Sequence, residues 1–221
     1  MLSKTKGFTR GLHACTIGLC LAAGLLATAA EGQVVINEIM QNPAAVSDGA
    51  GEWFEIFNPT AVGIDVDGWT IRDNDFDSHV IANGGPLVVP AGGFLVLSNN
   101  ADPSTNGGVG VDYEYSGVFL ANGADELVLI DGDGNEVDRV EWDGGPLFPD
   151  PTGASMALID PSLDNNAGGN WCTASTPFGD GDFGTPGAAN DCPVPVPEVV
   201  INEIMQNPAA VSDGAGEWFE I

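Results

Sequence analysis

Basic residues are almost absent from this chain of 221 residues. It has five lysines and arginines against 32 aspartates and glutamates, and three of the five precede residue 11. Beyond residue 30 only Arg72 and Arg139 remain, so two positive side chains oppose 32 negative ones and the formal charge is −30 with histidine neutral. A surface of this sign repels phosphate backbones and anionic lipid headgroups. The composition therefore argues against nucleic-acid binding and against an anionic membrane surface as a partner.

Cysteine and histidine are also scarce. Cys15 and Cys20 lie in the first thirty residues, which leaves Cys172 and Cys192. In an oxidising compartment we expect these two to form a disulfide. The alternative is a reactive free thiol, but no basic residue stands nearby to lower its pKa. His79 is the only histidine after the first thirty residues, so a nucleophilic triad has one candidate base, and we expect that residue in a surface turn.

Long apolar runs are absent except at the start. The first thirty residues have a basic part, an apolar part and a part of small residues: Lys4, Lys6 and Arg10, then Ala14 to Leu26, then Ala27 to Ala30. This order is typical of a signal peptide, so we expect export and cleavage after about residue 30. A retained anchor would need about 20 apolar residues. A lipid-modified Cys20 is disfavoured because the bulky Leu19 precedes it. We expect the mature chain in the periplasm, at the cell surface or outside the cell, with no membrane attachment.

Short β-prone runs between glycine, proline, asparagine and aspartate clusters fill the rest of the chain. Such spacing is typical of an all-β sandwich. The predicted strands are Val34 to Met40, Trp53 to Phe57, Gly68 to Ile71, Val80 to Ala82, Phe94 to Leu97, Val118 to Leu120, Glu126 to Ile130, Val137 to Trp142 and Ser155 to Ile159. Large apolar side chains on both faces of 53–57 indicate a central strand. Asp131 to Asn135 predicts a hairpin turn.

One stretch of 23 residues occurs twice. Residues 34–56 read VVINEIMQNPAAVSDGAGEWFEI, and residues 199–221 repeat every letter. Between the copies, residues 193–198 alternate proline and valine, which predicts an extended spacer. We therefore expect a signal peptide (1–30), one complete β domain (31–192), a linker (193–198) and the truncated start of a second copy of that domain (199–221). A recent duplication and an assembly artefact both explain the identity of the copies.

A series of motifs resembles the lamin tail domain family. They are VVINEIMQNP, GEWFEIFNPT, IDVDGWTIRD, AGGFLVLSNN, ELVLIDGDGNEVDRVEW and the closing NWC…TPGAAN, and they cover nearly all of residues 33–190. The resemblance implies an immunoglobulin-like β-sandwich with no catalytic activity of its own. In exported bacterial proteins such domains occur as repeats or beside secreted hydrolases. The family's recurring residues fall on Asn37, Glu38, Trp53, Glu55 and Asn58 of this sequence.

Two chemical interpretations compete with a structural one. Glu38 and Glu55 could form a carboxylate pair for acid–base catalysis, but in a chain with 32 acids we expect them instead to accept hydrogen bonds inside the sandwich. Asp131, Asp133 and Asn135 alternate as calcium ligands do. The sixth and twelfth positions of that loop lack the glycine and glutamate of an EF-hand, so solvated turn residues explain the same letters. No other cofactor is indicated.

These observations favour a non-catalytic, exported binding or structural module, acting on an unknown extracellular protein or cell-surface ligand. The alternative is an accessory or targeting domain of a larger secreted hydrolase of the nuclease or phosphatase type, whose catalytic part is missing from the sequence. An enzyme active within residues 31–192 is the third hypothesis. The sequence names neither the ligand nor the oligomeric state.

Overall fold

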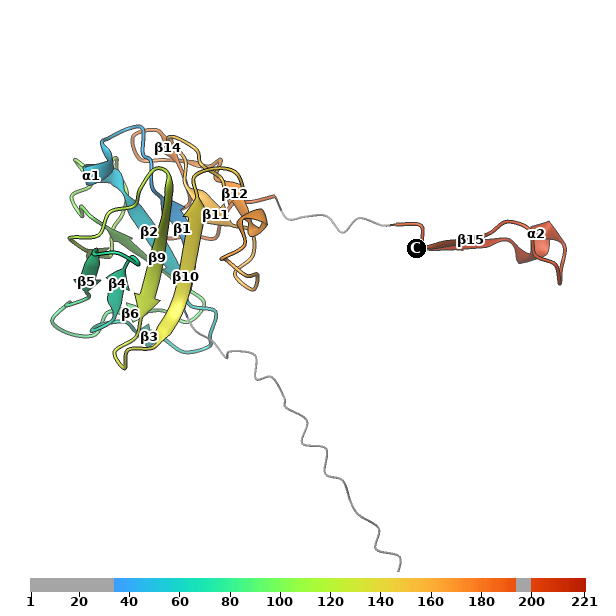
Figure 1. Ribbon diagram of the computed structural model, residues 1–221, viewed down its shortest axis with the longest axis horizontal. Helices are drawn as coiled ribbons and strands as arrows, with labels where there is room; N and C mark the ends of the chain where they lie inside the picture. The colour runs from blue at the N-terminus through green and yellow to red at the C-terminus, as the bar shows by residue number, and fades with distance from the viewer. Residues whose placement is uncertain (1–33, 194–199) are drawn as a thin grey trace, which may run out of the picture. The chain divides into compact units, whose positions relative to one another are not determined.

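Two facing β-sheets form the body of the protein (Figure 1). The computed structural model describes residues 34–193 and 200–221. The expected signal peptide and nearly all of the expected linker therefore lie outside the described residues. The first sheet has the strand order β12-β11-β1-β2-β7-β8 and the second has the order β10-β9-β4-β5. Neighbouring strands run antiparallel, except that β8 runs parallel to β7.

The elements of the first sheet are β1 (Val35–Met40), β2 (Trp53–Phe57), β7 (Phe94–Ser98), β8 (Tyr113–Glu114), β11 (Met156–Leu158) and β12 (Trp171–Thr173). The second sheet contains β4 (Thr70–Arg72), β5 (Ser78–Val80), β9 (Ala124–Ile130) and β10 (Glu136–Asp143). The smaller elements are α1 (Asp48–Gly51), β3 (Ile64–Asp65), β6 (Val88–Val89), η1 (Gly168–Asn170), β13 (Pro177–Phe178) and β14 (Asp182–Phe183).

Side chains that point to alternate faces of the strands form the apolar core between the two sheets. In β2, Phe54 and Ile56 point into the main apolar cluster, together with Ile71 of β4 and Leu129 of β9. Both faces of β2 are buried, because Trp53 and Glu55 are covered from the other side. The prediction of a central strand here is confirmed. The predicted hairpin is confirmed as well, since β9 and β10 pair around a turn that begins at Asp131.

One predicted strand is wrong. Val118 and Leu120 are buried and Phe119 is 61% exposed, so the stretch alternates as a strand would. Its backbone N–H groups do not join a ladder, however. Phe119 N donates to the carboxylate of Asp77 and Leu120 N donates to the carboxylate of Glu52. These N–H groups donate to side-chain carboxylates and not to the carbonyl groups of a neighbouring strand. The segment is therefore irregular and not a β-strand.

A third layer covers the outer face of the first sheet. Residues 174–192, called here the covering segment, follow β12 and cross that face. Ala174 and Cys192 pack on Ala157 of β11, and Phe178 packs edge-to-face on Trp53 with ring centroids 5.8 Å apart. The predicted disulfide between Cys172 and Cys192 is confirmed and joins β12 to the last residue of this segment.

The second copy of the repeated stretch forms a separate two-stranded sheet. Its elements are β15 (Glu203–Met205), α2 (Asp213–Gly216) and β16 (Trp218–Glu220), in the same order as β1, α1 and β2. Within the described residues no helix is long and apolar enough to span a bilayer.

Candidate functional site

A buried carboxylate pair lies in the middle of the first sheet. Glu38 of β1 stands directly opposite Glu55 of β2. A bulge between Ile36 and Glu38 lets Ile36 and Ile39 both enter the core, while Asn37 and Glu38 both leave it on the outer face. The covering segment then encloses the two carboxylates, and each glutamate has no solvent-exposed surface.

Every carboxylate oxygen of the pair has a hydrogen-bond donor. Glu38 accepts from the Ser155 hydroxyl (2.5 Å), the Thr185 N–H (2.8 Å) and the Thr185 hydroxyl (3.0 Å). Glu55 accepts from the Asn37 amide (2.8 Å) and from the Gly187 N–H (2.6 Å). Apart from the Asn37 amide, the donors are the backbone and hydroxyl groups expected from the sequence. They also attach the covering segment to the sheet, through residues 185 and 187.

Burial raises the pKa of both carboxyl groups. For Glu55 the loss of solvent raises the pKa to about 8, against the hydrogen bonds from Asn37 and Gly187, which lower it. For Glu38 the same loss of solvent raises the pKa, and the bonds from Ser155 and Thr185 oppose it. The two groups also repel each other when both are charged. Acid–base catalysis needs contact with a substrate, and neither carboxyl group reaches the surface.

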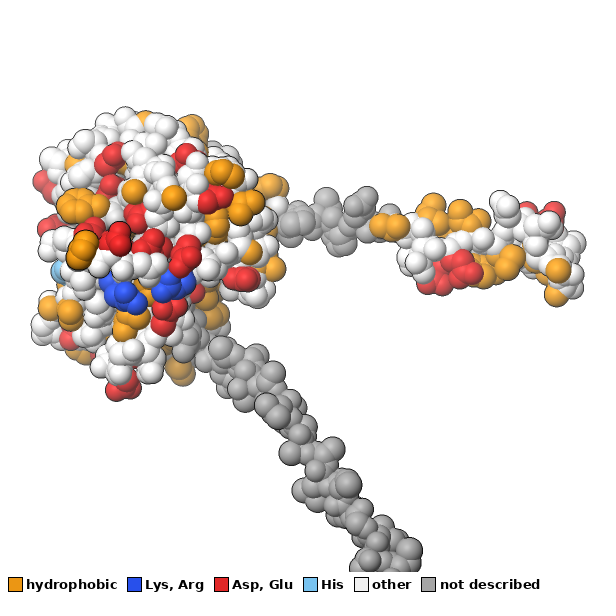
Figure 2. Space-filling view, in the orientation of Figure 1, with side chains coloured by type: hydrophobic (Ala, Val, Ile, Leu, Met, Phe, Trp, Pro, Cys, Tyr) orange, Lys and Arg blue, Asp and Glu red, His pale blue; other side chains and the backbone are white. Residues whose placement is uncertain are grey.

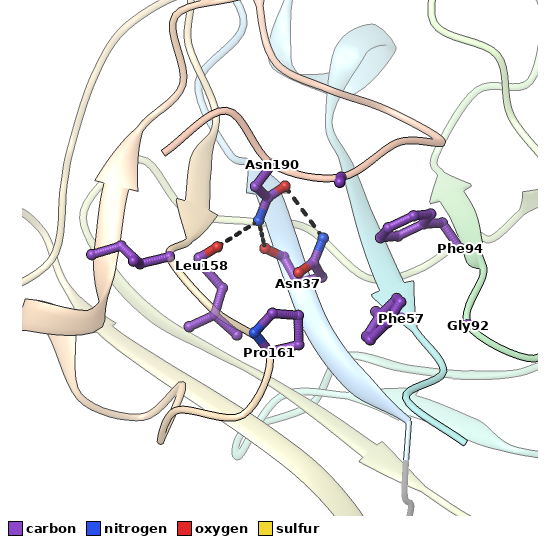
Figure 3. A pocket seen from close by; sticks show the side chains of 9 residues that line it. Asn37, Phe57, Gly92, Phe94, Leu158, Pro161 and Asn190 are labelled. Carbon is purple, nitrogen blue, oxygen red and sulfur yellow. Dashed lines mark hydrogen bonds between the residues drawn. The ribbon is translucent and has the colours of Figure 1, made fainter. Parts of the chain in front are cut away.

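An open, apolar cavity of about 380 Å³ adjoins this pair (Figure 3). We call it the Phe57–Phe94 pocket. Its lining comes from β1, β2, β7, β11 and the covering segment: Asn37, Phe57, Gly92, Phe94, Leu158, Ile159, Pro161, Ala189 and Asn190. The rings of Phe57 and Phe94 are tilted by 37° with centroids 5.0 Å apart and form one wall. Most of the lining is therefore hydrocarbon, as is common for ligand pockets.

Asn37 and Asn190 provide the polar part of the pocket. Asn190 Nδ2 donates to the carbonyl oxygens of Asn37 (2.9 Å) and Leu158 (2.8 Å), and its Oδ1 accepts from Asn37 Nδ2 (3.2 Å), as Figure 3 shows. Both amides thus have their donors bound inside the protein. The pocket holds no cysteine, histidine, serine or lysine, so among the described residues it offers no nucleophile or general base to a ligand.

The other family residues have structural positions. Asn58 directly follows β2, and its Nδ2 donates to the carbonyls of Val62 (2.7 Å) and Val89 (3.0 Å) while its Oδ1 accepts from Thr60 N (2.9 Å). Trp53 is 1% exposed and packs under Phe178. Asn37, Glu38, Trp53 and Glu55 lie together on one face of the sheet, and Asn58 lies at its end.

The loop of the predicted calcium ligands is a tight turn held by Asp131. The Asp131 carboxylate accepts from the N–H groups of Asp133 (2.9 Å) and Asn135 (2.8 Å) and from the Asn135 side-chain amide (2.9 Å). These bonds lower the pKa of Asp131. In the described part of the chain, no three histidine, cysteine, aspartate or glutamate side chains lie close enough to hold a metal ion. The geometry is that of a hydrogen-bonded turn.

His79 does not lie in a surface turn, contrary to the expectation. It belongs to β5 and is half-buried between Tyr113 and Tyr115. Its Nδ1 accepts from Ser116 N (3.2 Å), so Nε2 carries the proton and donates to the Tyr113 hydroxyl 2.9 Å away. Both ring nitrogens are occupied by the fold. Ser116 reaches the ring only through its backbone N–H, and no serine hydroxyl or cysteine thiol in the described part of the chain forms a hydrogen bond with it.

The two arginines occur on the outer face of the second sheet. In Figure 2 they are the blue side chains, and acidic side chains surround them. Arg72 and Arg139 flank Val128 in register across three strands, and Val128 is fully buried beneath them. Arg139 forms ion pairs with Glu136 and Glu141. The few cations therefore neutralise local acidic groups and do not form a basic patch.

Sequence reasoning missed the residues that complete the site. Phe57 and Phe94 were expected only as strand residues, and Ser155, Thr185 and Asn190 were not singled out. The closing motif TPGAAN contains Thr185, Gly187 and Asn190, so it carried the signal. The residues of this motif act on Glu38 and Glu55 because the covering segment brings them across the sheet.

Comparison with known proteins identifies the family. The model of the lamin tail domain matches residues 27–144, just over half of the chain. The match ends before β11 and before the covering segment, which both contact β1. A search of the curated proteins found no match. The two-sheet arrangement agrees with the immunoglobulin-like, non-catalytic β-sandwich of that family. The chain therefore belongs to the lamin tail domain family.

Proposed function

We propose that this chain is an exported, non-catalytic binding module, and that the Phe57–Phe94 pocket receives an apolar group of a protein or cell-surface ligand. One observation carries the proposal: the pocket is open and walled by hydrocarbon, while the acidic groups behind it are sealed and hydrogen-bonded. A pocket of this kind gains free energy from apolar contact but offers no reactive group.

Export is supported by three features. Residues 1–30 have the order of a signal peptide, the disulfide needs an oxidising compartment, and the strongly acidic composition keeps a chain dispersed outside the cell. The test is expression with the natural leader and mass determination of the secreted protein. We expect an N-terminus near residue 31. A product that retains residues 1–30 would contradict export.

Binding is tested by NMR titration of the ¹⁵N-labelled mature chain with N-acetylphenylalanine amide and N-acetylleucine amide. We expect the amide signals of Gly92, Ile159 and Ala189 to shift, because they line the pocket. Phe94→Ala should abolish these shifts. Phe119→Ala removes a phenylalanine that is 61% exposed and lies outside the pocket, so it should leave them unchanged. Absence of shifts at millimolar probe would refute the pocket assignment.

The non-catalytic part of the proposal has its own assay. The purified mature chain should not hydrolyse phosphodiester, phosphomonoester or glycoside model substrates. Turnover that co-purifies with the chain and disappears in Glu38→Gln or Glu55→Gln would show that the carboxylate pair is catalytic after all.

A further inference from the structure

Two phenylalanine rings stand in solvent beside one carboxylate. Phe76, in the loop between β4 and β5, is 97% exposed, the highest fraction of any large hydrophobic residue in the described part of the chain. Phe119 is also mostly exposed. Phe76 directly precedes Asp77, and Phe119 N donates to Asp77 Oδ2 at 3.1 Å, so both phenylalanines border the Asp77 side chain. We call residues 73–77 together with Phe119 the Phe76–Phe119 surface.

Hydrogen bonds fix the backbone that carries Phe76. Asp73 Oδ1 accepts from the N–H groups of Asp75 (2.8 Å) and Asp77 (3.0 Å), and Asp73 N donates to the carbonyl of Asp77 (3.2 Å). These bonds close the loop without using the phenyl ring, and the ring is too exposed to contribute to the packing of the fold. A ligand that covers the ring therefore meets a preorganised loop, and little entropy is lost in ordering it.

Phe119 is held in place by its neighbours in the chain. Val118 and Leu120 are both buried in the main apolar cluster, and Leu120 N donates to Glu52 Oε2 at 3.2 Å. The core and the contact with Asp77 thus set the position of Phe119, while its ring remains in solvent.

Acidic groups surround the two rings. Asn74 N donates to Glu126 Oε1 at 2.5 Å, so the start of β9 lies against the loop. Arg72 donates to the carbonyl of Asp73, and Arg139 donates to Asn74 Oδ1 and pairs with two glutamates. The carboxylates of this region are those of Asp73, Asp75, Asp77, Asp125, Glu126, Glu136 and Glu141. Two guanidinium groups among seven carboxylates leave five negative charges without a counter-charge.

An aromatic ring beside an open acceptor suits a guanidinium group. In residues 34–193 no group donates to Asp77 Oδ1 or to the carboxylate of Asp75. A guanidinium group can stack on a ring and donate to carboxylates at the same time. We propose that the Phe76–Phe119 surface docks a basic segment of a partner protein. An arginine of that segment binds Asp75 and Asp77, and its aliphatic stem packs against the two rings.

Charge selects this partner over the other occupants of an apolar surface. The formal charge beyond residue 30 is −30, so the chain attracts a basic segment and repels a second copy of itself. A purely apolar ligand would cover carboxylates without supplying a counter-charge, which is costly. The Phe76–Phe119 surface shares no residue with the Phe57–Phe94 pocket, so the proposal does not rest on the function proposed above.

The probe is a peptide of alternating arginine and alanine, titrated into the ¹⁵N-labelled mature chain at about 0.15 M salt. We expect the amide signals of Asp75, Phe76, Asp77 and Phe119 to shift together. A peptide in which glutamate replaces arginine should cause no shifts. Absence of shifts at millimolar arginine peptide would overturn the proposal. Shifts confined to the Phe57–Phe94 pocket, or spread evenly over the acidic residues, would overturn it as well, because docking at this surface would then not occur.

Substitutions of exposed side chains measure each part of the contact. Phe76→Ala and Phe119→Ala should each raise the Kd of the arginine peptide about 3- to 30-fold, as loss of a cation–π contact does, with the Tm unchanged. Asp75→Asn should raise it about 2- to 5-fold. The matched controls are Leu147→Ala, which removes another exposed apolar side chain, and Asp180→Asn, which removes one exposed charge elsewhere. Both controls should leave the Kd unchanged, and equal Kd values in test and control variants would refute the docking surface.

Discussion

The carboxyl group of Glu55 should make this protein less stable as the pH rises from about 4.5 to 8. Burial raises the pKa of Glu55 to about 8, whereas the unfolded chain has the ordinary value of 4.5. Between these values the folded state holds a proton that the unfolded state has released. The free energy of unfolding then falls with increasing pH, because the folded state binds more protons.

The magnitude follows from the difference between the two pKa values. Each unit corresponds to about 1.4 kcal/mol, so the full window is worth about 5 kcal/mol as an upper bound. Glu52, whose burial raises its pKa to about 7, and Asp138, whose burial raises its pKa to about 6, act in the same direction. Glu38 also lowers the stability as the pH rises, since burial raises its pKa as well.

Glu55→Gln isolates the contribution of one carboxyl group. Glutamine stays neutral at every pH, but it has one accepting oxygen, and its NH₂ group only donates, so it cannot accept from both Asn37 and Gly187. That loss costs about 1–3 kcal/mol at all pH values. At pH 4.5 the variant should therefore be less stable than the natural protein by this amount. At pH 8.5 it should be as stable or more stable, because it avoids the buried charge.

Urea unfolding followed by tryptophan fluorescence at half-unit steps of pH measures this crossover. Glu114→Gln, which changes an exposed glutamate, is the matched control and should leave the pH dependence unchanged. The reasoning is refuted if the natural protein is equally stable at pH 5 and 8.5. It is also refuted if Glu55→Gln loses the same free energy at both, since Glu55 would then act only as a hydrogen-bond acceptor.

Three further perturbations test other contacts. Replacing Cys172 and Cys192 by alanine should lower the free energy of unfolding by about 3 kcal/mol, from the sequence separation of 20 residues, and protease should then cut the covering segment first; equal protection with and without the disulfide would contradict this. Asp182→Ala leaves the N–H groups of residues 44 and 45 without their acceptor and should cost about 3 kcal/mol by urea unfolding, whereas Asp180→Ala, two residues away and exposed, should cost nothing measurable. Asp131→Ala should lower the free energy of unfolding by the same small amount with and without Ca²⁺; stabilisation of the natural protein by Ca²⁺ that is lost in this variant would support a calcium site at this loop.

Short-range patterns in the sequence were sufficient to predict the β-sandwich fold and the hairpin formed by β9 and β10. Alternation in 126–130 and 137–142, with the turn at Asp131, predicts β9 and β10 because the partners are close in sequence. The alternation of apolar side chains at Val118 to Leu120 led to the wrong prediction of a strand. There the burial pattern is strand-like, but the hydrogen-bond acceptors are carboxylates of Asp77 and Glu52, which no local pattern reveals.

Of the site, the sequence predicted only the buried glutamate pair. Glu38 and Glu55 were recognised, and their role as hydrogen-bond acceptors was expected. The donors on Ser155, Thr185 and Gly187 lie more than 100 residues away, so periodicity cannot connect them to the pair. The pocket was not predicted for the same reason, since it arises where β1, β7 and the covering segment meet.

The pairing of β1 with β11 has a consequence for how the protein is made. Glu38 stands opposite Ala157, 119 residues further along the chain. A polypeptide emerging from the ribosome at about 5–20 residues per second presents β1 roughly 6–24 s before that neighbour arrives. During this delay one edge of β1 is open to other strands. Completion of the sheet therefore competes with aggregation, and a chaperone that shields β1 until β11 has been synthesised should raise the yield of folded protein.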